Sequence, residues 1–379
     1  MSEQTVVRPV RTKKEHNLFI NFPYILYKKI LKNPYWAGPL RIDEKTLMNR
    51  RKHPFYRHAT MQQFLAWRGK EVVGRIAGII DEQYHTYREK DVAYFGFFEC
   101  VNDRDTAFAL FDAALSWARE RGMKRAIGPI SPHTNHILAV LQNDFNGVPM
   151  IQVPYNPDYY PALYDGYGFG KEKDHLAFIV HRDKLKLSDK IKRVAEVVRK
   201  RQRIEITTPD MRKFGDLVKE VKELYNQTWS ENSDFVPWTD EEFDFMAKDL
   251  KLVIVPELTF IARIDGKLVG ISITLYNINE ILAKMNGRLF PTGIFKLLFG
   301  LKKIKNVRLA ILGVHPSCRN MGIDAAFVME AYERGVKLGY ETCEMSLILE
   351  DNVPLVNMLN KWGAPVYRTY RVYCKDLSS

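Results

Sequence analysis

The stretch Val307-Arg-Leu-Ala-Ile-Leu-Gly-Val-His-Pro-Ser-Cys-Arg-Asn-Met-Gly-Ile-Asp-Ala-Ala-Phe-Val-Met329 decides the fold of this chain. Its first part, up to Val314, is almost entirely apolar, which is typical of a strand buried on both faces of a sheet. From Ala326 onward, apolar residues recur on one helix face and predict about four turns of amphipathic helix. The turn around Gly322 leaves helix N–H groups aimed at one point, where the helix dipole favours an anion. The stretch therefore predicts a phosphate site, although a sulfate or a plain tight connection fits the pattern as well.

A second strand and a short helix follow in the same order. Glu341 to Leu349 is rich in apolar residues, Asn352 comes next, and a short helix is expected to end at Trp362-Gly363. The predicted fold class is therefore α/β, with a mixed sheet.

The turn resembles a known family of enzymes. Arg319-Asn-Met-Gly-Ile-Asp324, after Val314-His-Pro316, resembles the pyrophosphate loop of the GNAT acyl-CoA N-acyltransferases. Asn320 stands where glycine is frequent, and Asp324 replaces a small residue. The tyrosine that often protonates the leaving thiolate would fall at Leu359. The resemblance implies that coenzyme A is bound by Val314, Arg319, Asn320, Met321, Gly322, Ile323 and Asn352.

Catalysis by such an enzyme needs a general base and an oxyanion donor. Glu350, at the end of the second strand, is the first candidate for the base, ahead of Glu344 and Asp351. A carboxylate in a partly dry cleft can have its pKa raised toward the working range of a base. The alternative is a solvated loop glutamate. The backbone N–H near Val314 is expected to stabilise the developing oxyanion.

An internal repeat divides the chain into two related halves. Phe64 and Phe260, which begin two similar strand, Gly-Lys turn, strand patterns, are 196 positions apart. We therefore expect two GNAT-like domains in tandem, at 1–183 and 204–379, joined by an exposed basic connector helix at 184–203. The first half carries acidic residues and no glycine around Glu99 to Phe108, where the phosphate turn should lie. Only the second domain is expected to bind coenzyme A.

Composition restricts the remaining possibilities. A hydrophobic content of 46% and the absence of a long apolar run predict a folded protein without a membrane span. The N-terminus lacks a signal-peptide pattern, so a cytoplasmic location is expected. The cysteines and histidines show no metal-ligand spacing, and no metal site is predicted. His133 and His136 are expected at the surface.

The net charge of +12 favours an acidic partner. Arg288 to Arg308 combines six basic residues with Phe, Leu and Ile and contains no acidic residue, which suits an anionic membrane surface. Leu18 to Lys32 shows a similar mixture. Both segments also fit core helices whose lysines face water. No motif for specific nucleic-acid binding is present.

Longer motifs resemble a bacterial group of tandem-GNAT proteins that includes ceramide synthase-like enzymes. They are Asn226 to Phe243, Pro154 to Tyr160 and Tyr367 to Tyr373. The expected reaction moves an acyl group from acyl-CoA or acetyl-CoA to a primary amine, such as a sphingoid base, at the inner membrane face. Expected acceptor-binding residues are Tyr155, Asn156, Tyr160 and Trp229. The alternatives are a small-molecule or Fem-like aminoacyl N-transferase, and a non-catalytic module that binds coenzyme A or lipid.

Overall fold

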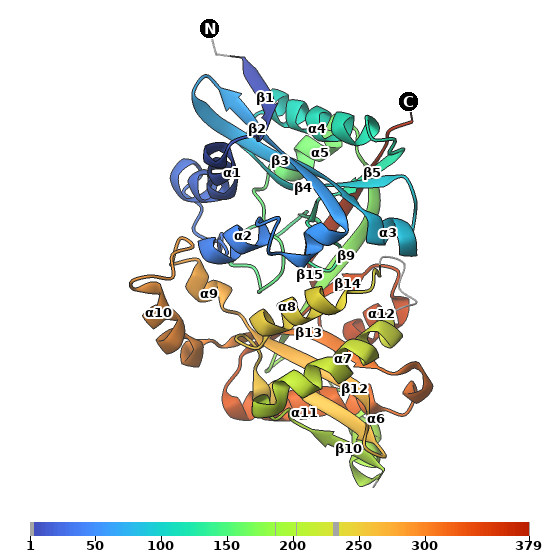
Figure 1. The fold of residues 1–379 in the computed structure, drawn as a ribbon. Coiled ribbons are helices and arrows are strands. Elements are labelled where there is room, and N and C mark those ends of the chain that lie inside the picture. The colour runs from blue at the N-terminus through green and yellow to red at the C-terminus, as the bar shows by residue number, and fades with distance from the viewer. Residues whose placement is uncertain (1–3, 186, 202, 230–234, 379) are drawn as a thin grey trace. The chain divides into compact units, whose positions relative to one another are not determined.

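The computed structural model describes residues 4–185, 187–201, 203–229 and 235–378. The chain forms two compact units. Unit 1 contains residues 1–175, 279–298 and 368–379, and unit 2 contains residues 176–278 and 299–367. Both units are mixed α/β structures, as the sequence predicts (Figure 1). Within the Asn226 to Phe243 motif, residues 230–234 lie outside the described part.

Unit 1 is a sheet with helices on both faces. Its strands follow the order β1-β2-β3-β4-β5-β15, and only β4 and β5 are parallel. Its main elements are β1 (Thr5–Pro9), α1 (Lys13–Ile25), α2 (Arg41–Leu47), β2 (Ala59–Arg68), β3 (Glu71–Asp81), α3 (Glu82–Tyr87), β4 (Val92–Cys100), α4 (Arg104–Arg119), β5 (Arg125–Gly128), β6 (Ile130–Ser131), β7 (Ile137–Leu138), β8 (Val140–Leu141), α5 (Tyr160–Tyr167) and α9 (Asn279–Leu282).

Unit 2 repeats this arrangement. Its strands follow the order β14-β13-β12-β11-β10, and the parallel pair is β13 and β14. Its elements are α6 (Asp189–Lys200), β10 (Ile204–Thr207), α7 (Phe214–Trp229), α8 (Asp240–Leu250), β11 (Phe260–Ile264), β12 (Lys267–Tyr276), β13 (Asn306–Val314), α11 (Ile323–Leu338), β14 (Thr342–Leu349) and α12 (Val353–Lys361). Three further elements cross a boundary between the units: β9 (Gly170–His181), α10 (Gly293–Gly300) and β15 (Val366–Asp376).

The hairpins of the internal repeat are confirmed. The β2–β3 hairpin shifts register after Ala66, and the β11–β12 hairpin shifts after Ala262, at the equivalent position of the repeat. Alternate residues of a strand face opposite sides of its sheet. In unit 1, Ile76 of β3 packs in the core with α4, whereas the Arg75 guanidinium lies over the ring of Phe19 in α1.

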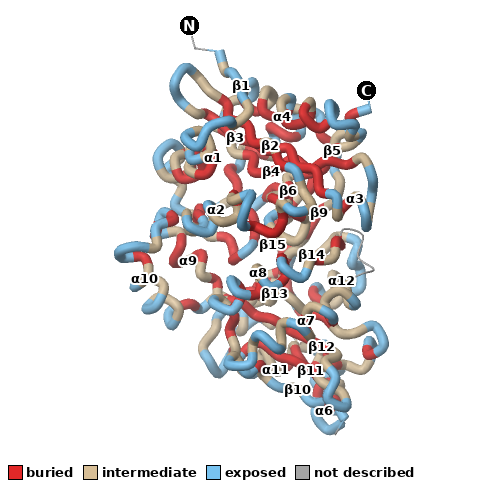
Figure 2. Tube along the Cα trace, in the orientation of Figure 1, coloured by how far each residue is buried: buried red, intermediate tan, exposed pale blue. Residues whose placement is uncertain are grey.

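Burial corrects two expectations from the sequence. The aromatic residues of Leu18 to Lys32 are not an interfacial surface, because Phe22, Tyr24 and Tyr27 are buried in unit 1 (Figure 2). Their burial places this segment in the core, with Lys29 and Lys32 exposed and Lys28 partly buried. His133, expected at the surface, is fully buried, and its Nε2 lies 3.5 Å from Asp81 Oδ2.

Helix α6 is packed more closely than an exposed connector would be. It begins after Ser188, as predicted, and the Ser188 hydroxyl accepts a hydrogen bond from the Ile191 N–H. Ala195 and Val198 are buried in a cluster with α11. Its apolar stripe therefore covers α11, while its basic face stays in water.

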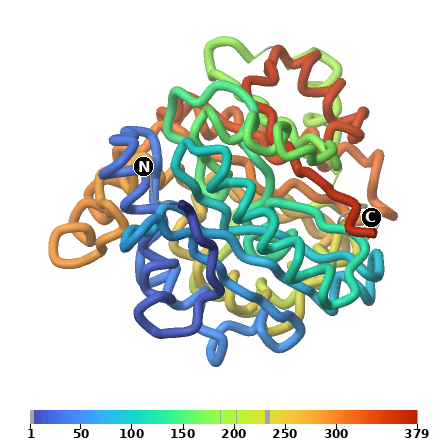
Figure 3. The backbone as a smooth tube through the Cα atoms, turned by 90° about the horizontal axis from the view of Figure 1, so that it is seen from above, coloured from blue at the N-terminus to red at the C-terminus, as the bar shows by residue number. Residues whose placement is uncertain are grey.

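The end of the chain belongs to unit 1. Residues 368–379 lie in that unit, where Tyr373 pairs with Gly128 and Asp376 pairs with Arg125 of β5. Figure 3 follows this red segment to the C-terminus. No helix within the described ranges has the length and hydropathy needed to cross a membrane.

Candidate functional site

The parallel strands β13 and β14 separate partway along their length. Their pairing runs from Asn306 with Thr342 to Leu309 with Met345, and no further pair joins them within the described chain. Beyond this last pair, the N–H and C=O groups on the facing edges of β13 and β14 no longer form hydrogen bonds with each other. The separation therefore opens a place where an extended ligand can meet the backbone of β13.

The N–H of Val314 points toward this opening. Gly270 of β12 lies opposite Val314, and the next N–H, that of His315, donates to the Val269 carbonyl at 2.8 Å. In an antiparallel ladder, hydrogen-bonded pairs alternate with non-bonded pairs. Val314 is thus in a non-bonded position relative to β12, and its N–H faces the side from which β14 has separated.

The turn after β13 has the backbone conformation that an anion cradle needs. Gly322 is the N-cap of α11 with φ +83°, and no side chain caps the helix there. Asn320 has φ +68°, and asparagine tolerates the left-handed region better than most residues, which explains its place in a turn that often carries glycine. The first N–H groups of α11 and the positive end of its dipole are therefore available to a phosphate.

The other predicted residues of this loop have structural roles. The exposed Arg319 donates to the carbonyl of Thr228 in α7 at 3.3 Å. Ile323 is fully buried, and Met321 packs at the edge of the same α6–α11 cluster. These two apolar side chains anchor the turn while its backbone carries the N–H groups.

The corresponding strands of unit 1 also separate, but the chain itself fills the space. Pairing of β4 with β5 extends only from Val92 with Arg125 to Tyr94 with Ile127. Just beyond it, the hydroxyl of Ser131 accepts a hydrogen bond from the N–H of Phe97 at 2.7 Å.

The residue of unit 1 equivalent to Val314 is Cys100, which lies opposite Gly74. Its N–H donates to the hydroxyl oxygen of Tyr160 at 2.8 Å, and that hydroxyl donates to Glu99 at 2.7 Å. Burial raises the pKa of Glu99 to about 7, against the opposing effects of Arg75 and the Tyr160 hydrogen bond. The amide that is open in unit 2 is occupied in unit 1.

A side chain of the protein also occupies the start of α4, the equivalent helix of unit 1. The Asp103 carboxylate caps α4 by accepting the N–H of Thr106 at 3.1 Å, and it pairs with Arg68 at 2.8 Å. An internal anion thus takes the position that an external phosphate could take at Gly322 of unit 2.

The three candidate carboxylates lie on or just after β14. Glu350 is partly buried at the end of the strand, and Asp351 is exposed. Glu344 is fully buried and accepts hydrogen bonds from the hydroxyls of Ser346 and Tyr367. Of the three, Glu350 lies at the open end of the strand, whereas Glu344 is enclosed.

Asn352 is the N-cap of α12, and its side-chain oxygen accepts the N–H of Leu355 at 3.4 Å. Its side chain therefore fixes the start of this helix.

No model of a known protein family matches the sequence. The chain is 32% identical to Protein YghO of Escherichia coli (strain K12), over 100% of this chain and 97% of that protein. It is 31% identical to a protein of Caulobacter vibrioides named bacterial ceramide synthase, over 98% of this chain and 97% of the relative. A solved tandem GNAT protein from the clavulanic acid biosynthesis pathway matches with a TM-score of 0.58 at 12% identity, over 99% of each chain.

The chain belongs to the tandem-GNAT acyltransferases. A GCN5-related N-acetyltransferase from Anabaena variabilis shares the fold, with a TM-score of 0.52 at 10% identity over 99% of this chain and 73% of that one. The GNAT resemblance of the sequence is thereby confirmed, and the chain is a GNAT-type enzyme that transfers acyl groups.

The residues predicted to bind the acceptor of this GNAT enzyme lie in different units. Tyr155, Asn156 and Tyr160 belong to unit 1, and Trp229 belongs to unit 2. Asn156 is buried, and its amide exchanges hydrogen bonds with the backbone of Leu141 at 2.7 and 3.2 Å. The Tyr155 hydroxyl donates to the Phe145 carbonyl at 2.9 Å. These polar groups hold the loops of unit 1 in place.

Trp229 lies beside β13, on which Val314 faces the opening. Its ring stacks on Tyr225 with centroids 4.5 Å apart, and it lies so close to Gly313 that a Cβ there would be 2.3 Å from the ring. Gly313 precedes Val314, so glycine at this position allows α7 to approach β13.

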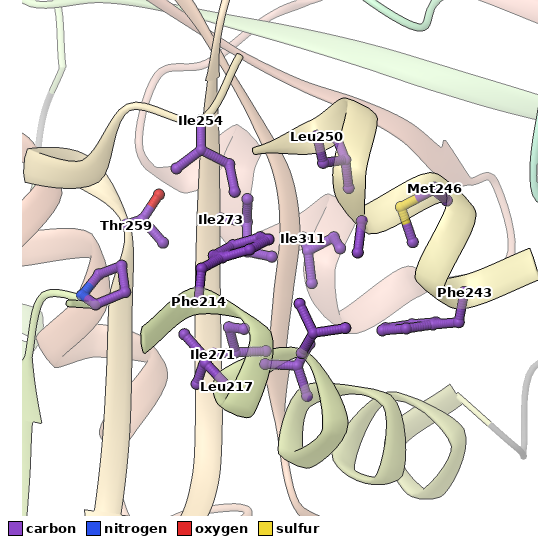
Figure 4. A pocket seen from close by; sticks show the side chains of 14 residues that line it. Phe214, Leu217, Phe243, Met246, Leu250, Ile254, Thr259, Ile271, Ile273 and Ile311 are labelled. Atoms are coloured by element: carbon purple, nitrogen blue, oxygen red, sulfur yellow. The ribbon is translucent and has the colours of Figure 1, made fainter. Parts of the chain in front are cut away.

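An apolar cavity lies between α7, α8 and the sheet of unit 2 (Figure 4). Its volume is about 40 Å³. Side chains of the two helices and of β12 and β13 line it, including Phe214, Met246, Ala247, Ile273 and Ile311. The face of the sheet covered by α7 and α8 is thus apolar close to β13.

The sequence did not reveal the network around Glu344. The Arg308 guanidinium donates to the Ser346 hydroxyl at 3.1 Å and to the Ser346 carbonyl at 2.9 Å, next to the Glu344 hydrogen bonds. Tyr367 stands in a motif that the sequence singled out, but nothing in its spacing indicates a partner on β14. This polar group ties β13, β14 and β15 together at the point of separation.

Proposed function

We propose that this enzyme transfers the acyl group of an acyl-CoA to the primary amine of a membrane lipid, such as a sphingoid base, at the inner membrane face. The neutral amine attacks the thioester carbonyl, a C–N bond forms, the C–S bond breaks and the coenzyme leaves as a thiolate. The N–H of Val314 donates to the oxyanion as charge develops. Glu350 accepts the proton lost by the amine, and solvent protonates the thiolate.

The donor side of the proposal is supported by the separated strands and the uncapped turn. The opening between β13 and β14 presents the Val314 N–H, and the N-terminus of α11 presents further N–H groups around Gly322. A thioester and its pyrophosphate need backbone donors at these two places. The name of the Caulobacter vibrioides relative supports an amide-forming reaction on a lipid.

The observation that carries the lipid acceptor is the exposed apolar face of α10. Phe295, Leu298 and Phe299 are 58%, 60% and 71% exposed. Residues at positions i, i+3 and i+4 lie on the same side of a helix, so the three side chains form one apolar face. Exposed apolar clusters of this kind mark interaction sites on soluble proteins.

Basic residues flank this face. Lys296, Lys302 and Lys303 are exposed, and 288–308 contains no acidic residue. Aromatic and leucine side chains can enter the acyl boundary of a bilayer while lysines meet lipid phosphates. Each lysine near an anionic leaflet contributes about 1 kcal/mol, an attraction that salt weakens.

Vesicle flotation together with acyl transfer tests the lipid proposal. The wild-type enzyme should float with vesicles that contain phosphatidylserine, less so at high salt, and should acylate sphinganine presented in those vesicles. The double variant Phe295→Ser with Phe299→Ser should lose most of the flotation and most of the acylation of sphinganine. Leu252→Ser is the matched control, because Leu252 is 75% exposed but lies outside α10.

Two results would contradict the proposal. If the wild type stays in the aqueous fraction and acylates only water-soluble amines, the acceptor is a small polar molecule. If the α10 double variant floats and acylates sphinganine as well as the wild type, this face is not the docking surface.

A further inference from the structure

A second apolar cavity lies on the opposite side of the same sheet, beneath α11. Its volume is about 100 Å³. It is lined mainly by apolar side chains from β13, β14, α11 and the end of α12, among them Val307, Leu309, Met345, Val328 and Trp362. Polar residues such as Arg182, Thr274 and Glu341 also line it.

This cavity lies beneath the paired segment of β13 and β14 and reaches the last pair before the strands separate. Leu309 and Met345 form the last pair between β13 and β14, and both side chains line the cavity. Val307 and Cys343, two residues earlier on the same strands, line it as well, as expected for residues on the same face. An acyl chain whose carbonyl lies between the separated strands thus has an apolar space next to the last pair.

The helix wall of the cavity contains an unusual residue. Gly335 is buried within α11 and lines the cavity, and a Cβ added to it would meet no atom within 4 Å. Glycine is among the least favourable residues in a helix interior, and no neighbouring atom requires one here. Ala331, one turn earlier, is also small and lines the same space. The two small residues keep this side of α11 open.

We infer that the cavity beneath α11 holds the acyl chain of the thioester and that Gly335 sets the length of chain that fits. This inference rests on the proposed acyl-CoA function and adds the site that selects the donor. The cavity beneath α7 and α8 is a weaker candidate, because it measures about 40 Å³ and no residue of β14 lines it.

Binding measurements test the inference without requiring the acceptor. Calorimetry with coenzyme A, acetyl-CoA, dodecanoyl-CoA and hexadecanoyl-CoA should show affinity rising with chain length in the wild type, by about fourfold for each methylene buried. Gly335→Leu should bind acetyl-CoA within twofold of the wild type and lose tenfold or more for hexadecanoyl-CoA. Gly335→Ala should bind hexadecanoyl-CoA nearly as well as the wild type.

Ala247→Val is the matched control, because it adds volume to the cavity beneath α8 instead. It should leave all four affinities unchanged. The inference is wrong if Gly335→Leu leaves the longer chains unaffected, if Ala247→Val causes the loss, or if affinity in the wild type does not depend on chain length.

Photolabelling keeps the test independent of variants that fail to fold. A hexadecanoyl-CoA with a diazirine at its chain end, bound to the wild type, should label α11 or β14 residues such as Tyr332 and Met345. Labelling of α7 or α8 would overturn the inference. If long-chain acyl-CoA binds beneath α11 but no lipid amine is acylated, the proposed function fails while this inference stands.

Discussion

Asp324 is the residue at which this chain departs most clearly from an anion-binding turn. It lies in the exposed first turn of α11, one residue after the uncapped start of the helix. Its carboxylate interacts favourably with the helix dipole, and it would repel a pyrophosphate placed at the same N–H groups, as we propose. A residue that favours the free helix therefore weakens the bound state.

Asp324→Asn should raise the affinity for coenzyme A several-fold and lower the free energy of unfolding by about 0.3–1 kcal/mol. Calorimetry and urea unfolding measure the two effects. Asp216→Asn, in the first turn of α7, is the control and should change only stability. An unchanged or lower affinity in Asp324→Asn would place the pyrophosphate elsewhere.

Glu350→Gln should preserve coenzyme binding and reduce turnover by roughly 10² or more, because the amide cannot accept the proton of the amine. Turnover should recover as pH rises, since a larger fraction of the acceptor is then already neutral. The measurement is the steady-state rate of thiol release from pH 6 to 10. A rate equal to that of the wild type at neutral pH would exclude Glu350 as the base.

At the scale of the element, β14 is held at its point of separation by hydrogen bonds that cross the sheet. Glu344 is fully buried on this strand, and the Tyr367 hydroxyl of β15 donates to it. A hydrogen bond to a charged group contributes about 1.5–3 kcal/mol, and a buried carboxylate that loses a donor is costly. The shape of the opening thus depends on a contact outside the two strands that form it.

Tyr367→Phe should lower the free energy of unfolding by about 1.5–3 kcal/mol. Urea unfolding monitored by circular dichroism measures the change. Tyr87→Phe is the control, because Tyr87 is exposed and the hydroxyl that this variant loses is hydrated in the folded and the unfolded chain alike. A loss below 0.5 kcal/mol in Tyr367→Phe would show that this contact does not hold β14.

The local elements of the site could be predicted from the sequence. The strand up to Val314, the turn at Gly322 and the helix after it each carry a signal within a few residues, either an apolar period or a glycine. Contacts between distant segments carry no such signal. The hydroxyl of Tyr160 accepts a hydrogen bond from the N–H of Cys100, which lies 60 positions away in the sequence. Nothing in the sequence around either residue indicates the other.

At the scale of the whole molecule, both units have a pair of parallel strands that separate and a helix that follows. They differ in whether side chains of the chain itself occupy the opening and the helix start. Tyr160 and Ser131 occupy the opening of unit 1, and Asp103 caps its helix. The equivalent helix start in unit 2, at Gly322, has no side-chain cap. Duplication can thus leave one copy to bind a ligand while the other becomes purely structural.

Titration should therefore give one coenzyme A per chain. Gly322→Glu should abolish binding, because its carboxylate repels the pyrophosphate and a Cβ at this position lies 2.4 Å from Val194. Circular dichroism must show that the variant is folded. Arg104→Glu, in the first turn of α4, is the control and should bind normally. A stoichiometry of two would show that unit 1 binds as well.

The pairing of β15 with β5 also determines the order in which the protein can mature. Synthesis proceeds from the N-terminus, and domains usually fold as they emerge. Yet one edge of the unit 1 sheet is completed only by residues 368–379, which are made long after β5. Until then β5 presents an unpaired edge, which invites pairing with other chains. A ribosome that stalls before residue 368 would release a nascent chain that is prone to aggregation, although β1 to β5 of the unit 1 sheet had all been made.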